Sequence, residues 1–192
     1  MSRRAQLVVA AVVVSATVGA ATGTAIAQGN RPRTEAVTGM FTGSPVNARQ
    51  RVCQGQDGTY LEIRGHFSGT IKSSDPRLTG TLDFMAEPAL VNLATGLGTF
   101  RGRFRVSEAA TGKQTAQGEF FTVVTEASLN HGFALGHVTN AGNGATDSFF
   151  ATFESTFDLA LNVSGQFGGV GDPRLPAVVQ GGHCSGPFTQ VP

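Results

Sequence analysis

The chain carries little charge and almost no lysine. Fourteen of its 192 residues are lysine or arginine and 13 are aspartate or glutamate, which gives a formal net charge of +1. Lys72 and Lys113 are the two lysines of the chain. Proteins that bind nucleic acid or anionic lipid surfaces depend on concentrated positive charge. The near-neutral composition therefore predicts a protein with no nucleic-acid partner.

The sequence also lacks the motifs of common enzyme classes. It has no Gly-x-Ser-x-Gly segment, and its glycines do not have the strand–turn–helix spacing of a nucleotide-binding loop. General acid–base chemistry needs carboxyl groups whose surroundings shift their pKa. The carboxylates here are scattered, and we assign most of them to faces in contact with solvent: Glu62, Asp83, Glu119, Glu126, Glu154 and Asp158. The sequence predicts no catalytic residue and no cofactor.

Residues 1–27 have the composition of a cleaved export signal. Two arginines precede an uncharged stretch over residues 7–26, and residues 24–27 place small side chains before a cleavage site. We expect cleavage before Gln28. A retained membrane anchor is the alternative, since about 20 apolar residues can span a bilayer. Serine, threonine and glycine dilute this stretch, however, which favours the cleaved signal.

Cleavage would leave a chain of one domain's length. We predict a flexible leader at residues 28–34, one domain at residues 35–192, and no membrane span after the signal is removed. The start of the chain, Ser2-Arg3-Arg4, also resembles a twin-arginine export signal, so this route and the general secretory route are both open. The predicted location is the cell envelope or the extracellular space.

Cysteine is scarce, and Cys53 and Cys184 are the two in the chain. In an exported protein such a pair is first interpreted as a disulfide. The bridge would close a loop of more than a hundred residues, which in the chain-entropy description is worth about 4–5 kcal/mol. A redox or metal role is the alternative, but no Cys-x-x-Cys occurs. We therefore predict a structural disulfide between Cys53 and Cys184.

A nine-residue pattern occurs twice. Residues 61–69 and 161–169 both read Leu-x-(Ile/Val)-x-Gly-x-Phe-x-Gly, and Asp-Pro-Arg-Leu follows each copy. Alternate apolar residues predict a strand with one buried face, glycine permits it to bend, and Asp-Pro is typical of a turn. The spacing between strand pattern and turn differs in the two copies, so we interpret them as curved strands. Asp75 and Asp172 are then expected to form turns and not to act as catalytic acids.

The same alternation runs through most of the chain and predicts an all-β domain. Gly-x-Phe-x-Gly recurs at residues 98–102, and alternating glycine and phenylalanine are typical of strongly curved strands. We predict a small antiparallel barrel of about eight or nine strands, with a β-sandwich as the alternative. Residues 87–95 interrupt the alternation and suggest a short helical turn at 88–92. The expected interior includes Phe67, Phe84, Phe100, Phe104, Phe120 and Phe153.

Two groups of side chains are candidates for binding. A strand over residues 131–137 would place His131 and His137 on one face about 20 Å apart, too far to share a metal. We therefore predict no metal site. Arg101, Arg103 and Arg105 share one face of another strand, where they could bind an anion. Pairing with carboxylates on neighbouring strands, such as Asp83 or Glu119, is the interpretation that we favour.

Two resemblances bear on the fold. Residues 74–82, Ser-Asp-Pro-Arg-Leu-Thr-Gly-Thr-Leu, and residues 92–98, Asn-Leu-Ala-Thr-Gly-Leu-Gly, resemble a group of exported bacterial proteins of uncharacterised function. The strands rich in glycine and phenylalanine are also similar to the small barrels of allene oxide cyclase and dirigent-type proteins. That similarity implies a barrel, but fold does not specify function. No segment matches the active-site patterns of those proteins.

These observations predict an exported, disulfide-closed barrel that serves as a non-catalytic binding or structural module. The alternative is a cyclase- or isomerase-like enzyme, or a carrier of a small apolar ligand, that uses the barrel cavity. The lining of the interior separates these functions. A cavity with an inward titratable side chain would favour the enzyme.

Overall fold

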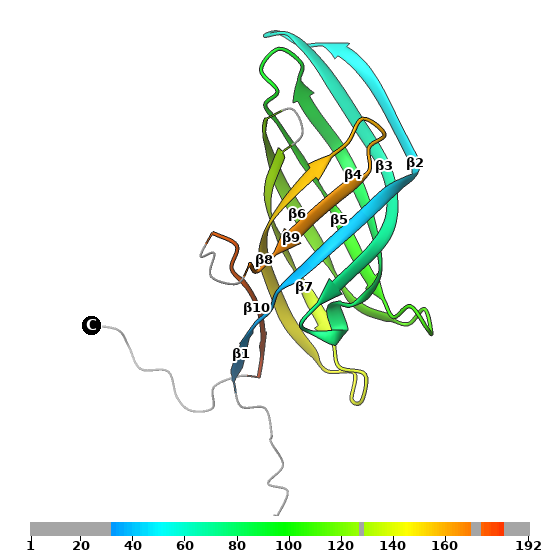
Figure 1. Cartoon of the computed structure of the whole chain (residues 1–192), viewed down its shortest axis with the longest axis vertical. Helices are drawn as coiled ribbons and strands as arrows, with labels where there is room; N and C mark the ends of the chain where they lie inside the picture. Colours follow the sequence, from blue (N-terminus) through cyan, green and yellow to red (C-terminus); the bar gives the residue numbers. More distant parts are fainter. Residues whose placement is uncertain (1–31, 127–128, 170–173, 183–192) are drawn as a thin grey trace, which may run out of the picture.

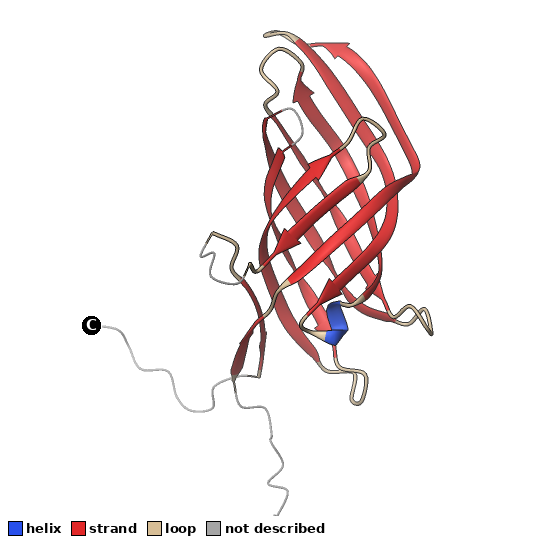
Figure 2. Cartoon of the chain, in the orientation of Figure 1, coloured by secondary structure: helices blue, strands red, loops and turns tan. Residues whose placement is uncertain are grey.

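The structure, a computed structural model, describes residues 32–126, 129–169 and 174–182 (Figure 1). The predicted signal peptide, His183 and Cys184 lie outside these residues. No helix of the described part is long and apolar enough to cross a membrane. The described residues form ten strands and one short 3₁₀ helix: β1 (Arg33–Ala36), β2 (Gly39–Gln54), β3 (Thr59–Ser73), η1 (Pro76–Leu78), β4 (Gly80–Asn92), β5 (Gly98–Ser107), β6 (Gln114–Glu126), β7 (Leu129–Thr139), β8 (Thr146–Phe157), β9 (Val163–Phe167) and β10 (Ala177–Gly181). The predicted all-β fold is confirmed (Figure 2).

Eight of these strands form a closed antiparallel barrel. From β2 to β8 each strand pairs with the next in sequence, and β9 lies between β8 and β2. Residues 39–43 of β2 form one side of this seam and residues 153–157 of β8 form the other. β10 pairs with residues 148–151 of β8, and β1 pairs with β10 outside the barrel. The predicted barrel is confirmed, and the sandwich alternative is wrong.

Glycine and phenylalanine occupy matching positions on neighbouring strands. A Cβ atom on Gly102 would lie 2.0 Å from the Met85 carbonyl oxygen and 2.5 Å from the Phe120 ring. A Cβ atom on Gly118 would meet the Leu135 carbonyl oxygen at 2.0 Å and the Phe104 ring at 2.7 Å. Only glycine permits so close an approach, and the neighbouring ring covers the space that it leaves. This pairing explains why the two residue types alternate in the sequence.

Phenylalanine fills the interior. Phe67 is 1% exposed and stacks on Phe84, with ring centroids 4.9 Å apart. Edge-to-face contacts continue from Phe84 to Phe120 and from Phe120 to Phe100. All six phenylalanines predicted for the interior are in the core or packed against it: Phe67, Phe84, Phe100, Phe104, Phe120 and Phe153.

The two copies of the repeated pattern lie on opposite sides of β2. Phe67 of β3 is opposite Pro45, whereas Phe167 of β9 is opposite Gly39. Both phenylalanines are buried in the barrel. The copies therefore share an inward face but not a register. This arrangement confirms that the repeat represents barrel strands.

The helical turn predicted at residues 88–92 is wrong, because these residues continue β4. The register with both β3 and β5 shifts near Pro88, where β4 contains one more residue than either neighbour. The bulge changes the phase of the alternation, so that Ala86 and Ala89 are both buried. Proline is tolerated at a bulge because no ladder hydrogen bond is required there.

Candidate functional site

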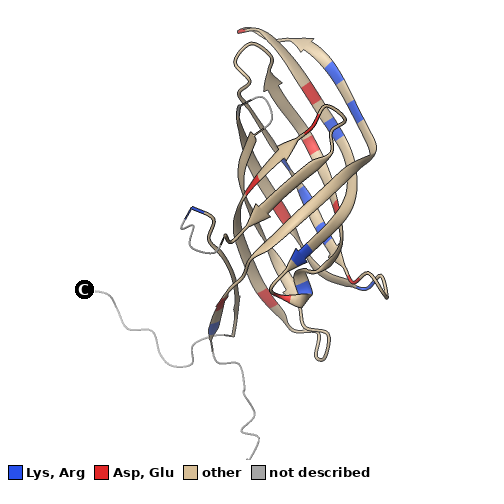
Figure 3. Ribbon diagram, in the orientation of Figure 1, with Lys and Arg blue, Asp and Glu red and all other residues tan. Residues whose placement is uncertain are grey.

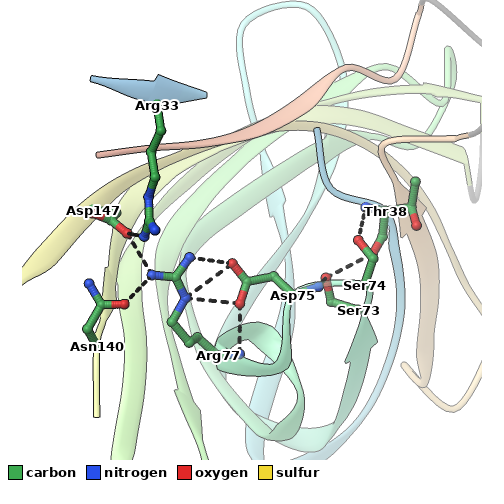
Figure 4. Close-up of polar contacts among 8 residues, drawn as sticks. All are labelled: Arg33, Thr38, Ser73, Ser74, Asp75, Arg77, Asn140 and Asp147. Carbon is green, nitrogen blue, oxygen red and sulfur yellow. Dashed lines mark hydrogen bonds and ion pairs between the residues drawn. The ribbon is translucent and has the colours of Figure 1, made fainter. Parts of the chain in front are cut away.

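A network of charged side chains closes one end of the barrel (Figure 4). Asp75 accepts a hydrogen bond from the backbone N–H of Arg77 at 2.9 Å and so caps η1. The Arg77 guanidinium donates to both oxygens of Asp75 and, at 2.6 Å each, to Asp147 and Asn140. Arg33 of β1 donates to the same Asp147 oxygen at 2.6 Å. The network thereby joins β1, η1 and the β7–β8 hairpin.

The paired arginines keep both carboxylates ionised. Burial acts to raise the pKa of Asp75, but hydrogen bonds from Arg77 outweigh it and leave the pKa below its ordinary value. Burial of Asp147 is likewise outweighed by hydrogen bonds from Arg77 and Arg33, which lower its pKa. The hydrogen bond to Asp75 raises the pKa of Arg77. These groups carry fixed charges, so the network is suited to holding the fold together.

Asp75 is therefore a turn-forming residue, as predicted. Asp75 also forms an ion pair with Arg77, and Arg77 in turn pairs with Asp147 of β8, 70 residues along the chain, which the pattern did not reveal. The corresponding Asp172 lies outside the described residues. Leu78 and Leu175, which end the two Asp-Pro-Arg-Leu segments, are both buried.

An apolar cavity of about 90 Å³ lies inside the barrel. Aromatic rings form most of its wall, and no titratable side chain lines it. Ser155 is the polar residue of the wall. The lining residues are Phe41, Ile71, Leu82, Phe84, Phe100, Phe104, Phe120, Ala134, Phe149, Ala151, Phe153, Ser155, Phe157, Val163 and Phe167. The chemistry of this wall favours an uncharged, apolar occupant.

Three neutral polar residues lie inside the barrel away from the charged network. Thr122, Asn130 and Ser155 are 4%, 1% and 4% exposed. The Asn130 amide donates to the Ser155 carbonyl oxygen at 3.2 Å. The Thr122 hydroxyl has no hydrogen-bond partner, and it is the one buried side-chain group of the described residues in this condition. A buried polar group without a partner is uncommon and requires an explanation.

Sequence reasoning did not identify these three residues as a site. Thr122 falls on the inward face of β6 between Phe120 and Val124, as the alternation predicts. A polar residue on an otherwise apolar face was the available signal. Whether such a residue finds a partner depends on the strands across the barrel, which the local pattern does not show.

The three arginines of β5 are exposed, and Figure 3 marks the basic positions along the strands. Arg101 lies 3.4 Å from a Glu87 oxygen, and Arg103 lies 3.9 Å from Glu87 and 3.8 Å from Glu119. Pairing across strands, the favoured interpretation, is therefore confirmed for these two. Among the described residues no carboxylate lies within ion-pair distance of Arg105. Asp83, a predicted partner, instead lies 3.2 Å from His66.

The histidines of β7 share one face of the strand, as predicted, and the structure shows that both are exposed. His131 lies 3.3 Å from Glu154 of β8, and His137 is opposite Ser148. Within the described ranges no three histidine, cysteine or acidic side chains are grouped as a metal site would require.

Glu62 departs from the prediction that the carboxylates contact solvent. It is 5% exposed, although it lies on the outer face of β3. Arg51 and Arg64 lie against it and exclude water, with 2.6 Å between Arg51 Nε and a Glu62 oxygen. Hydrogen bonds from these arginines lower the pKa of Glu62. The group is a surface ion pair covered by its own partners.

Cys184 lies outside the described residues, so the distance between the two cysteines is bounded from neighbouring residues. Cys53 is half-buried, fourteen residues along β2 from Gly39, a separation of about 45 Å in a strand. Gly181, three residues before Cys184, pairs with Arg33 beyond the other end of β2. Three residues span about 10 Å. The bridge remains a prediction, and within one chain it would require the end of the domain to leave this position.

Comparison with known proteins adds no relative. No family model, curated protein or solved structure matches the chain. The resemblances to an exported bacterial group and to cyclase and dirigent barrels therefore remain predictions.

Proposed function

We propose that this chain is an exported, non-catalytic module that binds a small apolar molecule inside its barrel. The apolar cavity carries this proposal. Nine phenylalanines line it. Their rings form an apolar surface that is unfavourable for water and favourable for an apolar molecule. Apolar cavities of about 150 Å³ with similar walls stay dry and accept benzene or xenon. A space of about 90 Å³ suits a shorter alkyl chain or a compact ring fragment.

The composition of the wall favours binding over catalysis. A cyclase or isomerase needs a group that donates, accepts or stabilises charge beside the substrate. The lining residues include one hydroxyl, that of Ser155, and no titratable group. Export through residues 1–27 and the disulfide between Cys53 and Cys184 belong to the same proposal. A protein outside the cytoplasm meets small apolar molecules that have been released from cells or membranes.

Titration with pentane tests this function. Methyl resonances of Ala134, Ala151 and Val163, which line the cavity, should shift and reach saturation. Ala134→Leu places three more carbons in the cavity and should weaken binding at least ten-fold. Leu135→Ala changes the next residue, whose side chain is 46% exposed, and should leave the affinity unchanged.

A spectrum of the unliganded variant shows whether Ala134→Leu is folded. Ala151→Val is the smaller replacement if it is not. The function is overturned if the wild-type resonances do not saturate, or if both cavity variants bind pentane as the wild type does.

A further inference from the structure

Four polar side chains form a row across the outer face of β5, β6, β7 and β8. Arg105 of β5 is opposite Gln117 of β6. His137 of β7 lies between Gln117 and Ser148 of β8 in the same register. All four residues are exposed. Neighbouring strands lie about 4.8 Å apart, so the row extends for roughly 15 Å along the surface.

The donors of this row have no acceptor within the described part of the chain. None of the four side chains donates a hydrogen bond to another described residue. Gln117 accepts a hydrogen bond from Gln114 at 3.0 Å, which leaves its own amide N–H groups free. Asp83 is opposite Arg105, but it lies 3.2 Å from His66 instead. The row therefore remains available to another molecule.

The row lies in a hollow of the outer surface with a volume of about 1090 Å³. Ligand pockets in proteins have volumes of about 300–1,000 Å³, so the hollow is large enough to hold a ligand. Met85, which is 55% exposed, adds apolar surface to the wall. Two arginines and two carboxylates line the hollow, so its charges balance when its histidines are neutral. This balance favours a neutral occupant.

A stacked pair of phenylalanines lies on the same outer face. Phe121 of β6 and Phe133 of β7 are opposite one another, with ring centroids 5.2 Å apart. They are 37% and 40% exposed. Each lies four residues along its strand from the row, and an even separation keeps it on the same face. An exposed apolar surface commonly marks a binding site, and this one adjoins a row of unused donors.

We propose that this outer face binds a neutral oligosaccharide, at a site separate from the cavity inside the barrel. A sugar hydroxyl both donates and accepts hydrogen bonds. It can accept from Arg105 or Gln117 and donate to a carboxylate of the hollow. The C–H faces of sugar rings are apolar and gain from contact with Met85 and the phenylalanine pair. A chain of several rings matches the length of the row, whereas a single ring does not.

An extended peptide is a poorer match to this face. Peptides that bind to sheets commonly pair with the backbone of a free strand edge. The strands β5, β6 and β7 are each paired on both sides, so they present side chains and no backbone edge. The ligand must therefore be recognised through side chains, as the hydroxyl groups of a sugar can be.

Titration with cellotriose and maltotriose tests the site. Both trisaccharides are neutral, and their chains differ in shape. The backbone amide resonances of Gly118 and Gly136, which line the hollow, should shift and reach saturation with at least one of them. These signals are distinct from the cavity methyl resonances that report pentane, so failure of this site and failure of the proposed function are distinguishable. The site is overturned if neither trisaccharide saturates the two amides.

Three variants identify the residues of the site. Arg105→Met removes a charged donor and should weaken binding by about ten-fold, and His137→Ala removes a neutral one and should weaken it by about five-fold. His131→Ala is the matched control, because His131 is exposed on the same face of β7 but is not part of the wall of the hollow. It should bind the sugar as the wild type does.

Two results would contradict the assignment. Equal affinities of the wild type, Arg105→Met and His137→Ala would overturn the site, as would equal weakening by the two histidine substitutions. Tetraglutamate provides an anionic probe. If it saturates the amides of Gly118 and Gly136 and neither trisaccharide does, the hollow is an anion site and its assignment to a sugar is wrong.

Discussion

Burial of a polar group without a partner costs free energy, and two sets of buried polar groups in this barrel differ in whether they have partners. At the closed end, Arg77, Asp75, Asp147 and their neighbours pair with one another. Elsewhere in the interior, Asn130 is bonded but the Thr122 hydroxyl is not. The comparison shows which groups the fold must pair and which it can leave without a partner.

The difference follows from the cost of leaving each group unpaired. A buried carboxylate or guanidinium without a partner costs several kcal/mol, so a stable fold must pair it. An unpaired hydroxyl costs about 1–3 kcal/mol. Arg77 of η1 and Asp147 of β8 are paired for this reason, whereas one orphaned hydroxyl can be retained.

Replacement of Arg77 should give the largest effect on stability. Arg77→Met leaves Asp75 buried without its cation and removes one of the two arginines that bond Asp147. We expect the free energy of unfolding to fall by about 3–5 kcal/mol, as measured by urea denaturation. Arg105→Met is the matched control, because this exposed arginine has no carboxylate within ion-pair distance among the described residues. It should change stability by about 0.5 kcal/mol or less. Equal effects of the two substitutions would contradict a structural role for the network.

Acid should weaken the closed end selectively. The pKa values of Asp75 and Asp147 are lowered in the folded protein, chiefly by hydrogen bonds from their arginine partners that outweigh burial, so in acid the folded state binds fewer protons than the unfolded state. Their contribution to stability is complete above about pH 5 and is lost as the pH falls through the folded pKa values. Urea midpoints measured between pH 6 and pH 2 should decline steeply in the wild type and less in Arg77→Met. Parallel curves would show that other groups control acid unfolding.

Among the uncharged buried residues, Asn130 is hydrogen-bonded and so can be compared with Thr122. Asn130→Ala removes the donor to the Ser155 carbonyl oxygen. It also leaves a space at a position where the native side chain is almost fully buried, with the residue 1% exposed. We expect a loss of about 1–3 kcal/mol in the free energy of unfolding. An unchanged urea midpoint would mean that this hydrogen bond contributes nothing to the interior.

Thr122→Val should give the smallest effect and with the opposite sign. It removes a hydroxyl that has no partner and keeps the volume of the side chain. The free energy of unfolding should stay unchanged or rise by about 1 kcal/mol, in contrast with Asn130→Ala. Destabilisation as large as that of Asn130→Ala would remove the distinction between the two residues.

The barrel could be predicted because its signal is local. Phenylalanine and glycine alternate at positions such as Gly102 and Phe104, and a strand buries every second residue whatever lies across from it. The same rule placed Thr122 inside. It failed at residues 88–92, because the bulge near Pro88 shifts the alternation and depends on the register with two neighbouring strands. It placed Glu62 on the correct, outer face but did not show its burial, because Arg51 and Arg64 cover that side chain from outside the sheet.

By itself, the sequence determined that this protein is all-β with an aromatic interior, because the period of side chains along a strand needs no knowledge of distant residues. The tertiary structure decided which polar groups find partners. Arg77 meets Asp147 at a sequence separation of 70 residues, and Thr122 meets none. Closing the barrel sets both outcomes, because closure alone determines which side chains share the interior.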